Sequence, residues 1–162
     1  MSRRVLVCGA SAGIGRAIAL GFAQQGDTVF GLARREERLN ELVPKGVFPI
    51  VADLDDREEA LSRVRMHLPF HVVINNTGGP ASGSLIEASC VELENGFARH
   101  VLVSHMILQA VLPGMMKEDF GRFINIISTS VYSAARRITA STTSRSRSLH
   151  LRMRRALQDK SR

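Results

Sequence analysis

The chain has 162 residues, of which 44% are hydrophobic, and it carries a formal net charge of +7. This length is enough for the core of one domain, and a content of only two cysteines excludes a disulfide-stabilised scaffold. No apolar run reaches the roughly 18 residues of a membrane span, and the opening residues lack the pattern of a signal peptide. We therefore expect a cytoplasmic protein without membrane contact.

The first predicted element is a buried strand that ends in a glycine-rich turn. Residues 4–9 (RVLVCG) are apolar and rich in β-branched side chains, which is typical of a strand inside a sheet. After the turn, apolar residues recur at helical spacing. They predict a helix that packs on the sheet through Ile14, Ala17, Ile18, Gly21 and Phe22.

Two further strands alternate with charged helical stretches. Residues 27–33 predict the second strand, and residues 34–43 predict a short solvated helix. Residues 46–54 predict the third strand, which we place at a sheet edge because its Pro49 cannot donate a hydrogen bond to a neighbouring strand. Residues 56–68 predict the helix that follows.

The remaining ordered elements are two strands and an apolar helix. Residues 71–79 predict a fourth strand that runs into a loop, and residues 121–128 predict the fifth. The helix predicted at residues 97–112 is apolar on more than one side. It is either wedged between the sheet and a loop or forms a contact between copies in a homo-oligomer.

Strands that alternate with helices imply right-handed crossovers and a parallel sheet covered on both faces. The sequence therefore predicts an α/β protein with a doubly wound, Rossmann-like sheet of five strands. In such folds, ligands bind at the carboxyl ends of the strands where the strand order reverses. The glycine turn after the first strand lies at that place.

The turn itself has the chemistry of a phosphate cradle. Gly9, Gly13 and Gly15 leave its backbone open, and the N–H groups of the following helix can then face a pyrophosphate. Ser11 and Ile14 lie in the same turn, and the hydroxyl of Ser11 could bind a phosphate or ribose oxygen. The strand, turn and helix together span about 30 residues, which is the context this motif requires. The alternative is that the glycines serve close packing alone.

These motifs resemble those of the short-chain dehydrogenase/reductase family. The stretch CGASAGIG (residues 8–15) is similar to the glycine loop of that family, with Cys8 in place of a threonine. Asp53 matches the family's aspartate near the adenine. The stretch NNTGG matches its N-N-A-G motif and supplies Asn75, Asn76 and Gly78 to the cofactor site. The resemblance covers residues 4 to about 131, and a typical member has about 250 residues, so the fold is expected to be incomplete.

The residues after the second strand indicate which dinucleotide is bound. NAD-binding members place an acid there for the ribose 2′-hydroxyl, whereas a 2′-phosphate requires a cation. This chain has Ala33 at the position of the acid, followed by Arg34 and Arg35. The sequence therefore predicts NADP, read by Arg34, with NAD as the alternative; Arg35 could instead be the solvated start of the next helix.

The catalytic residues that the resemblance implies are only partly present. Ser128 matches the family's serine, which would polarise a substrate carbonyl. The family's tyrosine and lysine lie further on, where this chain has Ser141. The only tyrosine, Tyr132, begins YSAAR, which resembles Y-x-x-x-K with Arg136 for the lysine, but it follows Ser128 too closely to face the same substrate. His100 occupies the position of a family asparagine, and no histidine has partners at metal-ligand spacing, so no metal site is predicted.

Residues 132–162 form a second region after the domain predicted at residues 1–131. The last 29 residues hold nine Lys and Arg and one Asp, whereas the first 133 residues hold 13 and 14. This basic, Arg/Ser-rich tail, without glycine or proline, predicts disorder or an irregular helix. It is a frame-shifted end of the reading frame after Val131, an arm that binds nucleic acid through phosphates, or a solvated tail.

Two functions follow from these expectations. The first is an NADP(H)-dependent oxidoreductase for a carbonyl or alcohol substrate, for example of the 3-oxoacyl type, with an incomplete catalytic apparatus. The second is a non-catalytic dinucleotide-binding fragment with an arginine-rich tail that binds nucleic acid. We favour the first, with a small molecule rather than nucleic acid as the partner.

Overall fold

The computed structural model describes residues 2–78 and 88–127. The chain divides into two compact units. The first consists of Met1–Gly78 and Ser104–Ile126 and contains the sheet; the second consists of Gly79–Val103 and Ile127–Arg162. In the described ranges, no helix has the length and apolarity needed to cross a membrane.

The first unit is built on a five-stranded sheet in which every neighbouring pair is parallel, in the order β3-β2-β1-β4-β5. The strands are β1 (Arg4–Cys8), β2 (Thr28–Ala33), β3 (Val47–Val51), β4 (Val72–Asn75) and β5 (Arg122–Asn125). The order reverses between β1 and β4, which confirms the doubly wound fold predicted from the sequence. The carboxyl ends of β1 and β4 therefore flank the switch point.

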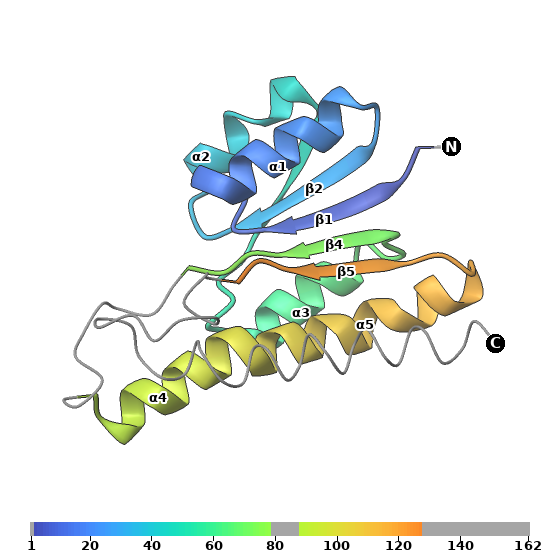
Figure 1. The fold of residues 1–162 in the computed structure, drawn as a ribbon. Helices are drawn as coiled ribbons and strands as arrows, with labels where there is room; N and C mark the ends of the chain where they lie inside the picture. Colours follow the sequence, from blue (N-terminus) through green and yellow to red (C-terminus); the bar gives the residue numbers. More distant parts are fainter. Residues whose placement is uncertain (1, 79–87, 128–162) are drawn as a thin grey trace. The chain divides into compact units, whose positions relative to one another are not determined.

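Helices cover both faces of this sheet. The helices and the 3-10 turn of the first unit are α1 (Gly13–Gln24), α2 (Glu36–Asn40), η1 (Val43–Lys45), α3 (Arg57–Arg65) and α5 (Val103–Lys117), whose first residue belongs to the second unit. Figure 1 shows α1 and α2 on one face and α3 and α5 on the other. This is the arrangement that right-handed crossovers between parallel strands produce.

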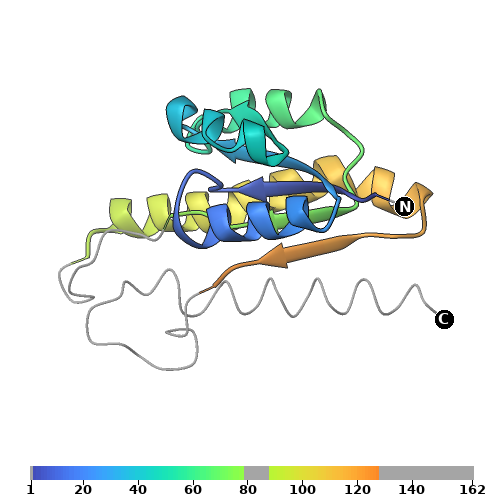
Figure 2. The same cartoon turned by 90° about the horizontal axis from the view of Figure 1, so that it is seen from above.

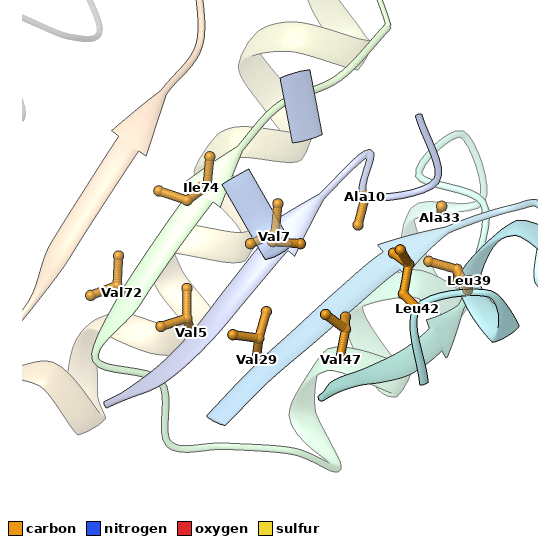
Figure 3. Packing of buried hydrophobic residues seen from close by; sticks show 11 residues of the cluster. Val5, Val7, Ala10, Val29, Ala33, Leu39, Leu42, Val47, Val72 and Ile74 are labelled. Atoms are coloured by element: carbon orange, nitrogen blue, oxygen red, sulfur yellow. The ribbon is translucent and has the colours of Figure 1, made fainter. Parts of the chain in front are cut away.

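A row of four valines forms the centre of the core beneath α1 and α2. Val47, Val29, Val5 and Val72 are in register across β3, β2, β1 and β4, and each is at most 3% exposed. Figure 3 shows this row together with Val7, Ile74 and Leu39, which pack beside it. In β1, β2 and β4 consecutive residues are buried, so these three apolar strands are covered on both faces.

The inward face of α1 differs from the prediction by one position. Ile14 is 60% exposed and Ala17 is also exposed, whereas Gly15 and Ala19 are buried. The helix begins at Gly13, so its first turn lies at the end of the strands, and Ile14 there projects into solvent instead of onto the sheet. Ile18 and Phe22 do pack on the core, as predicted.

The helix predicted at residues 97–112 is longer than expected. The helical path starts with α4 (Cys90–Phe97), continues through a π-helical turn, η2 (Ala98–Leu102), and ends with α5 at Lys117. Pro113 lies inside α5 and does not end it. Every fourth residue of α5 is buried, namely Val103, Ile107, Val111 and Met115.

In the second unit, α4 begins with a complete capping box. Ser89 accepts a hydrogen bond from the Glu92 backbone N–H, and the Glu92 carboxylate accepts one from the Ser89 N–H at 2.7 Å. These bonds from Ser89 lower the pKa of Glu92. In η2, burial, with a smaller contribution from the Arg99 charge, lowers the pKa of His100.

The edge strand β3 carries Pro49, as predicted. The Ala52 N–H donates to the Ala33 carbonyl, and because donors alternate along a parallel strand, Pro49 lies at a position that faces away from β2. Its missing N–H therefore costs the sheet no hydrogen bond. Figure 2 shows β5, in orange, at the opposite edge of the sheet.

Candidate functional site

Two of the three glycines in the turn after β1 are required for close packing. Gly9 has a φ of +68°, and a Cβ on it would overlap the Asn76 carbonyl oxygen. A Cβ on Gly15 would overlap the Gly9 carbonyl oxygen and lie 2.8 Å from the Asn76 Nδ2. The Asn76 amide in turn donates to the Cys8 carbonyl at 3.4 Å. Asn76 thus holds the turn against the end of β4.

The third glycine is free of such packing. Gly13 has a φ of +53°, and among the described residues no atom lies within 4 Å of the place that its Cβ would take. The same holds for Gly78, beyond the end of β4. The packing alternative therefore accounts for Gly9 and Gly15 and does not account for Gly13.

The amino terminus of α1 has no side-chain cap. Its N-cap residue is Ala12, and no acidic residue lies in its first turn. By contrast, Asp56 caps α3 by accepting a hydrogen bond from the Glu59 N–H at 3.2 Å. The first N–H groups of α1 carry the partial positive charge of the helix end, and they face the turn that Gly13 leaves open. This end of the helix has the features of an anion site.

Arg35 brings a cation to this turn. Its Nη2 atom donates to the Ser11 Oγ at 3.0 Å, and Ser11 is 8% exposed. Within the described ranges, Arg35 forms no ion pair with a carboxylate. Its charge is therefore available to a ligand that approaches the turn.

Arg34, the residue predicted to read the cofactor, is engaged differently. Its Nη1 atom lies 3.6 Å from the Asp53 Oδ2, and the two side chains are 68% and 42% exposed. Asp53 also accepts a hydrogen bond from the Asp55 N–H at 3.0 Å. Both Arg34 and Asp53 line a pocket of about 480 Å³ next to β3 and α3. The two successive arginines thus point to different neighbours of β2: Arg35 contacts the turn after β1, and Arg34 contacts Asp53 beyond β3.

Asn75 joins the ends of two strands. Its Nδ2 donates to the Asn125 Oδ1 on β5 at 2.8 Å, and the Ser104 hydroxyl of α5 donates to the same oxygen at 2.8 Å. Asn75 and Ser104 are buried, at 4% and 0% exposure. The paired asparagines in the sequence gave a signal for Asn75 and Asn76, whereas Asn125 and Ser104 carry no motif.

Cys8 at the end of β1 does not contribute reactive chemistry. Its side chain is fully buried, and burial raises the pKa of the thiol to about 12. The two predicted catalytic residues, Ser128 and Tyr132, lie outside the described residues. The predicted site residues that the structure describes are therefore only those that the sequence assigned to the cofactor.

A family model for short chain dehydrogenases matches residues 3–152. The chain belongs to the short-chain dehydrogenase family. The match continues past residue 131, where the sequence predicts the boundary between the dinucleotide-binding domain and the basic tail. This domain boundary remains a prediction.

Curated relatives support the same family. L-xylulose reductase of Caenorhabditis elegans is 32% identical over 134 residues, which make up 78% of this chain and 53% of that protein. The NADP-dependent 3-hydroxy acid dehydrogenase YdfG of Escherichia coli O157:H7 is 36% identical over 138 residues, or 78% of this chain and 54% of the relative. The chain therefore spans about half the length of the curated relatives it matches.

Solved structures give the same result. A short-chain dehydrogenase from Streptomyces avermitilis is 35% identical, with a TM-score of 0.76 over 80% of this chain and 50% of that one. A short-chain dehydrogenase from Sphingobium yanoikuyae in complex with NADPH is 25% identical, with a TM-score of 0.76 over 86% and 60%. The chain shares its fold with both structures.

Proposed function

We propose that this chain binds NADP(H) as part of an oxidoreductase that acts on a carbonyl or alcohol substrate. The observation that carries the proposal is the open, uncapped start of α1, with Gly13 unpacked and Arg35 unpaired with any described carboxylate beside it. An enzyme in complex with NADPH shares the fold, and a relative is an NADP-dependent dehydrogenase.

The residues of the turn fit a dinucleotide in a specific way. The first N–H groups of α1, with Ile14 exposed beside them, would bind the diphosphate, because a helix amino terminus favours negative charge. Arg35, aligned by Ser11, would bind the 2′-phosphate of the adenosine ribose. Gly78 would leave room for the cofactor next to β4. When bound, NADP(H) supplies hydride exchange with a carbonyl or alcohol carbon.

Further parts of the reaction rest on the family resemblance. Ser128 is proposed to donate a hydrogen bond to the substrate oxygen, which stabilises the negative charge that develops there. No proton donor is proposed, since Tyr132 follows Ser128 too closely in the sequence to face the same substrate. The relatives act on L-xylulose or a 3-hydroxy acid according to their names, and we propose a small carbonyl or alcohol of that kind as the substrate.

The proposal is tested by a carboxylate placed at the open glycine. In Gly13→Asp the added charge lies at the amino terminus of α1, where it repels a diphosphate. Gly26→Asp is the matched control, because Gly26 has a φ of +83°, follows the C-cap residue Gln25 of α1 and likewise has no described atom within 4 Å of its Cβ position. Asp tolerates the left-handed conformation better than most residues, so both variants keep the fold.

Titration with NADPH, followed by its fluorescence, should show affinity reduced about ten-fold or more in Gly13→Asp. Gly26→Asp should bind as the wild type does, and thermal melting should show a cooperative transition for both variants. Oxidation of NADPH with a panel of aldehydes and ketones then tests turnover. Absence of NADPH binding by the wild type, or equal binding by both variants, contradicts the cofactor proposal, and binding without turnover contradicts the oxidoreductase proposal.

A further inference from the structure

Arg34 and Asp53 form a pair whose charges cancel at the edge of the proposed cofactor site. Arg34 follows β2 directly and Asp53 lies two residues beyond β3, so the parallel sheet brings both to its carboxyl edge. Their closest charged atoms are 3.6 Å apart. Arg35, the next residue, contacts Ser11 and no described carboxylate. Only one of the two arginines therefore presents an uncompensated charge.

Arg34 and Asp53 lie at a pocket and not on a flat surface. Both side chains line the pocket of about 480 Å³, together with residues of β3 and α3. This volume lies in the range of small-molecule sites. The Asp53 carboxylate and the Arg34 guanidinium are thus both accessible to a ligand in this pocket.

We propose that Asp53 sets the selectivity of this site between a phosphorylated and an unphosphorylated adenosine ribose, because it withholds Arg34 from the ligand. This inference rests on the proposed function. A 2′-phosphate can form an ion pair with Arg34 only if the guanidinium leaves Asp53. The phosphate is also repelled by the Asp53 carboxylate, because both groups are negatively charged. A ribose 2′-hydroxyl has neither cost and can donate a hydrogen bond to the carboxylate. Asp53 thus reduces the preference for NADP that Arg35 provides.

The expected size of the effect is modest. Exposed ion pairs at this separation contribute little individually, which corresponds to a factor of up to about five in a binding constant. Loss of the Asp53 charge should therefore raise the preference for 2′,5′-ADP over 5′-AMP about two- to five-fold. The same change should leave affinity for 5′-AMP within about two-fold, since Asn retains the shape and an acceptor oxygen.

The test is a double-mutant cycle with these two nucleotides as probes, measured by calorimetry on the full chain. Asp53→Asn should raise the preference for 2′,5′-ADP, and the gain should disappear in the Arg34→Ala background. Glu59→Gln is the matched control: Glu59 lines the same pocket at a similar exposure, 47%, but pairs with Arg63 at 3.1 Å. It should leave the preference unchanged.

Three results would overturn the inference. The first is an unchanged preference for 2′,5′-ADP over 5′-AMP in Asp53→Asn. The second is a gain in that preference that persists in the Arg34→Ala background, which would indicate direct repulsion by the carboxylate. The third is the same gain in Glu59→Gln. Wild-type protein that binds 2′,5′-ADP while any of these occurs leaves the proposed function standing. Wild-type protein that binds neither nucleotide contradicts both proposals.

Discussion

The Nη2 atom of Arg35 lies 3.0 Å from the Ser11 Oγ, so the cation that follows β2 is fixed to the turn that follows β1. We therefore expect Arg35→Gln to weaken binding of 2′,5′-ADP about ten-fold or more and to change binding of 5′-AMP less than about two-fold. Arg38→Gln is the control, because Arg38 is an arginine of α2 paired with Glu41 at 3.0 Å. Equal losses for both nucleotides would show that Arg35 does not read the 2′-phosphate.

Gly15 and Gly21 lie in the same helix but have different surroundings. A Cβ on Gly15 would meet the Gly9 backbone and Asn76, whereas no atom of residues 2–78 or 88–127 lies within 4 Å of a Cβ on Gly21. Gly15→Ala should lower the free energy of unfolding by about 1–3 kcal/mol through overpacking. Gly21→Ala should raise it by about 0.5–1 kcal/mol, because alanine favours the helix. Urea unfolding measures both, and a stable Gly15→Ala variant would contradict the packing role.

Asp27 and Arg3 make the acid stability of the first unit depend on one carboxylate. The Asp27 side chain is 5% exposed and accepts hydrogen bonds from the Arg3 guanidinium at 2.6 Å and from its backbone N–H at 3.0 Å. The side-chain hydrogen bonds from Arg3 lower the pKa of Asp27. Because the pKa is lower in the folded chain, the stabilisation is complete above about pH 4 and is lost as the pH falls through the folded value.

Asp27→Asn should therefore lower the free energy of unfolding by about 1–2 kcal/mol at neutral pH, and the difference from wild type should shrink below about pH 4. Urea unfolding at several pH values measures this. Glu94→Gln, which changes an exposed carboxylate of α4, should have little effect at any pH. A constant difference across the acid range would show that the charge of Asp27 is not the cause.

The two cysteines should differ sharply in reactivity. Cys8 is fully buried with a pKa raised to about 12, and Cys90 is exposed at the start of α4. A thiol reagent should label one thiol in the native chain at about pH 8 and both after denaturation, since the thiolate is the nucleophile. Cys90→Ser should abolish native labelling. Native labelling that persists in Cys90→Ser would show that β1 opens on the timescale of the reaction.

The sheet was predictable because its signals are local. The apolar run of β1 is continuous from Val5 to Cys8, and burial of β1 on both faces requires that continuity. Pro49 identified an edge strand for a reason that holds in any sheet. The inward face of α1 was wrong by one position, because it depends on where the helix starts, and the left-handed Gly13 decides that start.

The site was only partly predictable, because its roles depend on contacts between distant residues. The sequence favours Arg34 over Arg35 for the 2′-phosphate, but it does not show that Arg34 pairs with Asp53 and that Arg35 bonds to Ser11. Gly9, Gly13 and Gly15 likewise share one motif, but only the position of Asn76 shows which of them are needed for packing. Such distinctions come from strand order, which no short stretch of sequence encodes.

Pro49 also limits how copies of this protein can associate wrongly. An exposed strand edge is a template on which chains of other molecules can assemble into extended, insoluble ribbons. A strand that paired with the open edge of β3 would lack one hydrogen bond, because Pro49 has no N–H to donate. Fibrillar growth from this side is therefore disfavoured, and replacing the proline with a β-branched residue would remove the safeguard without disturbing the pairing with β2.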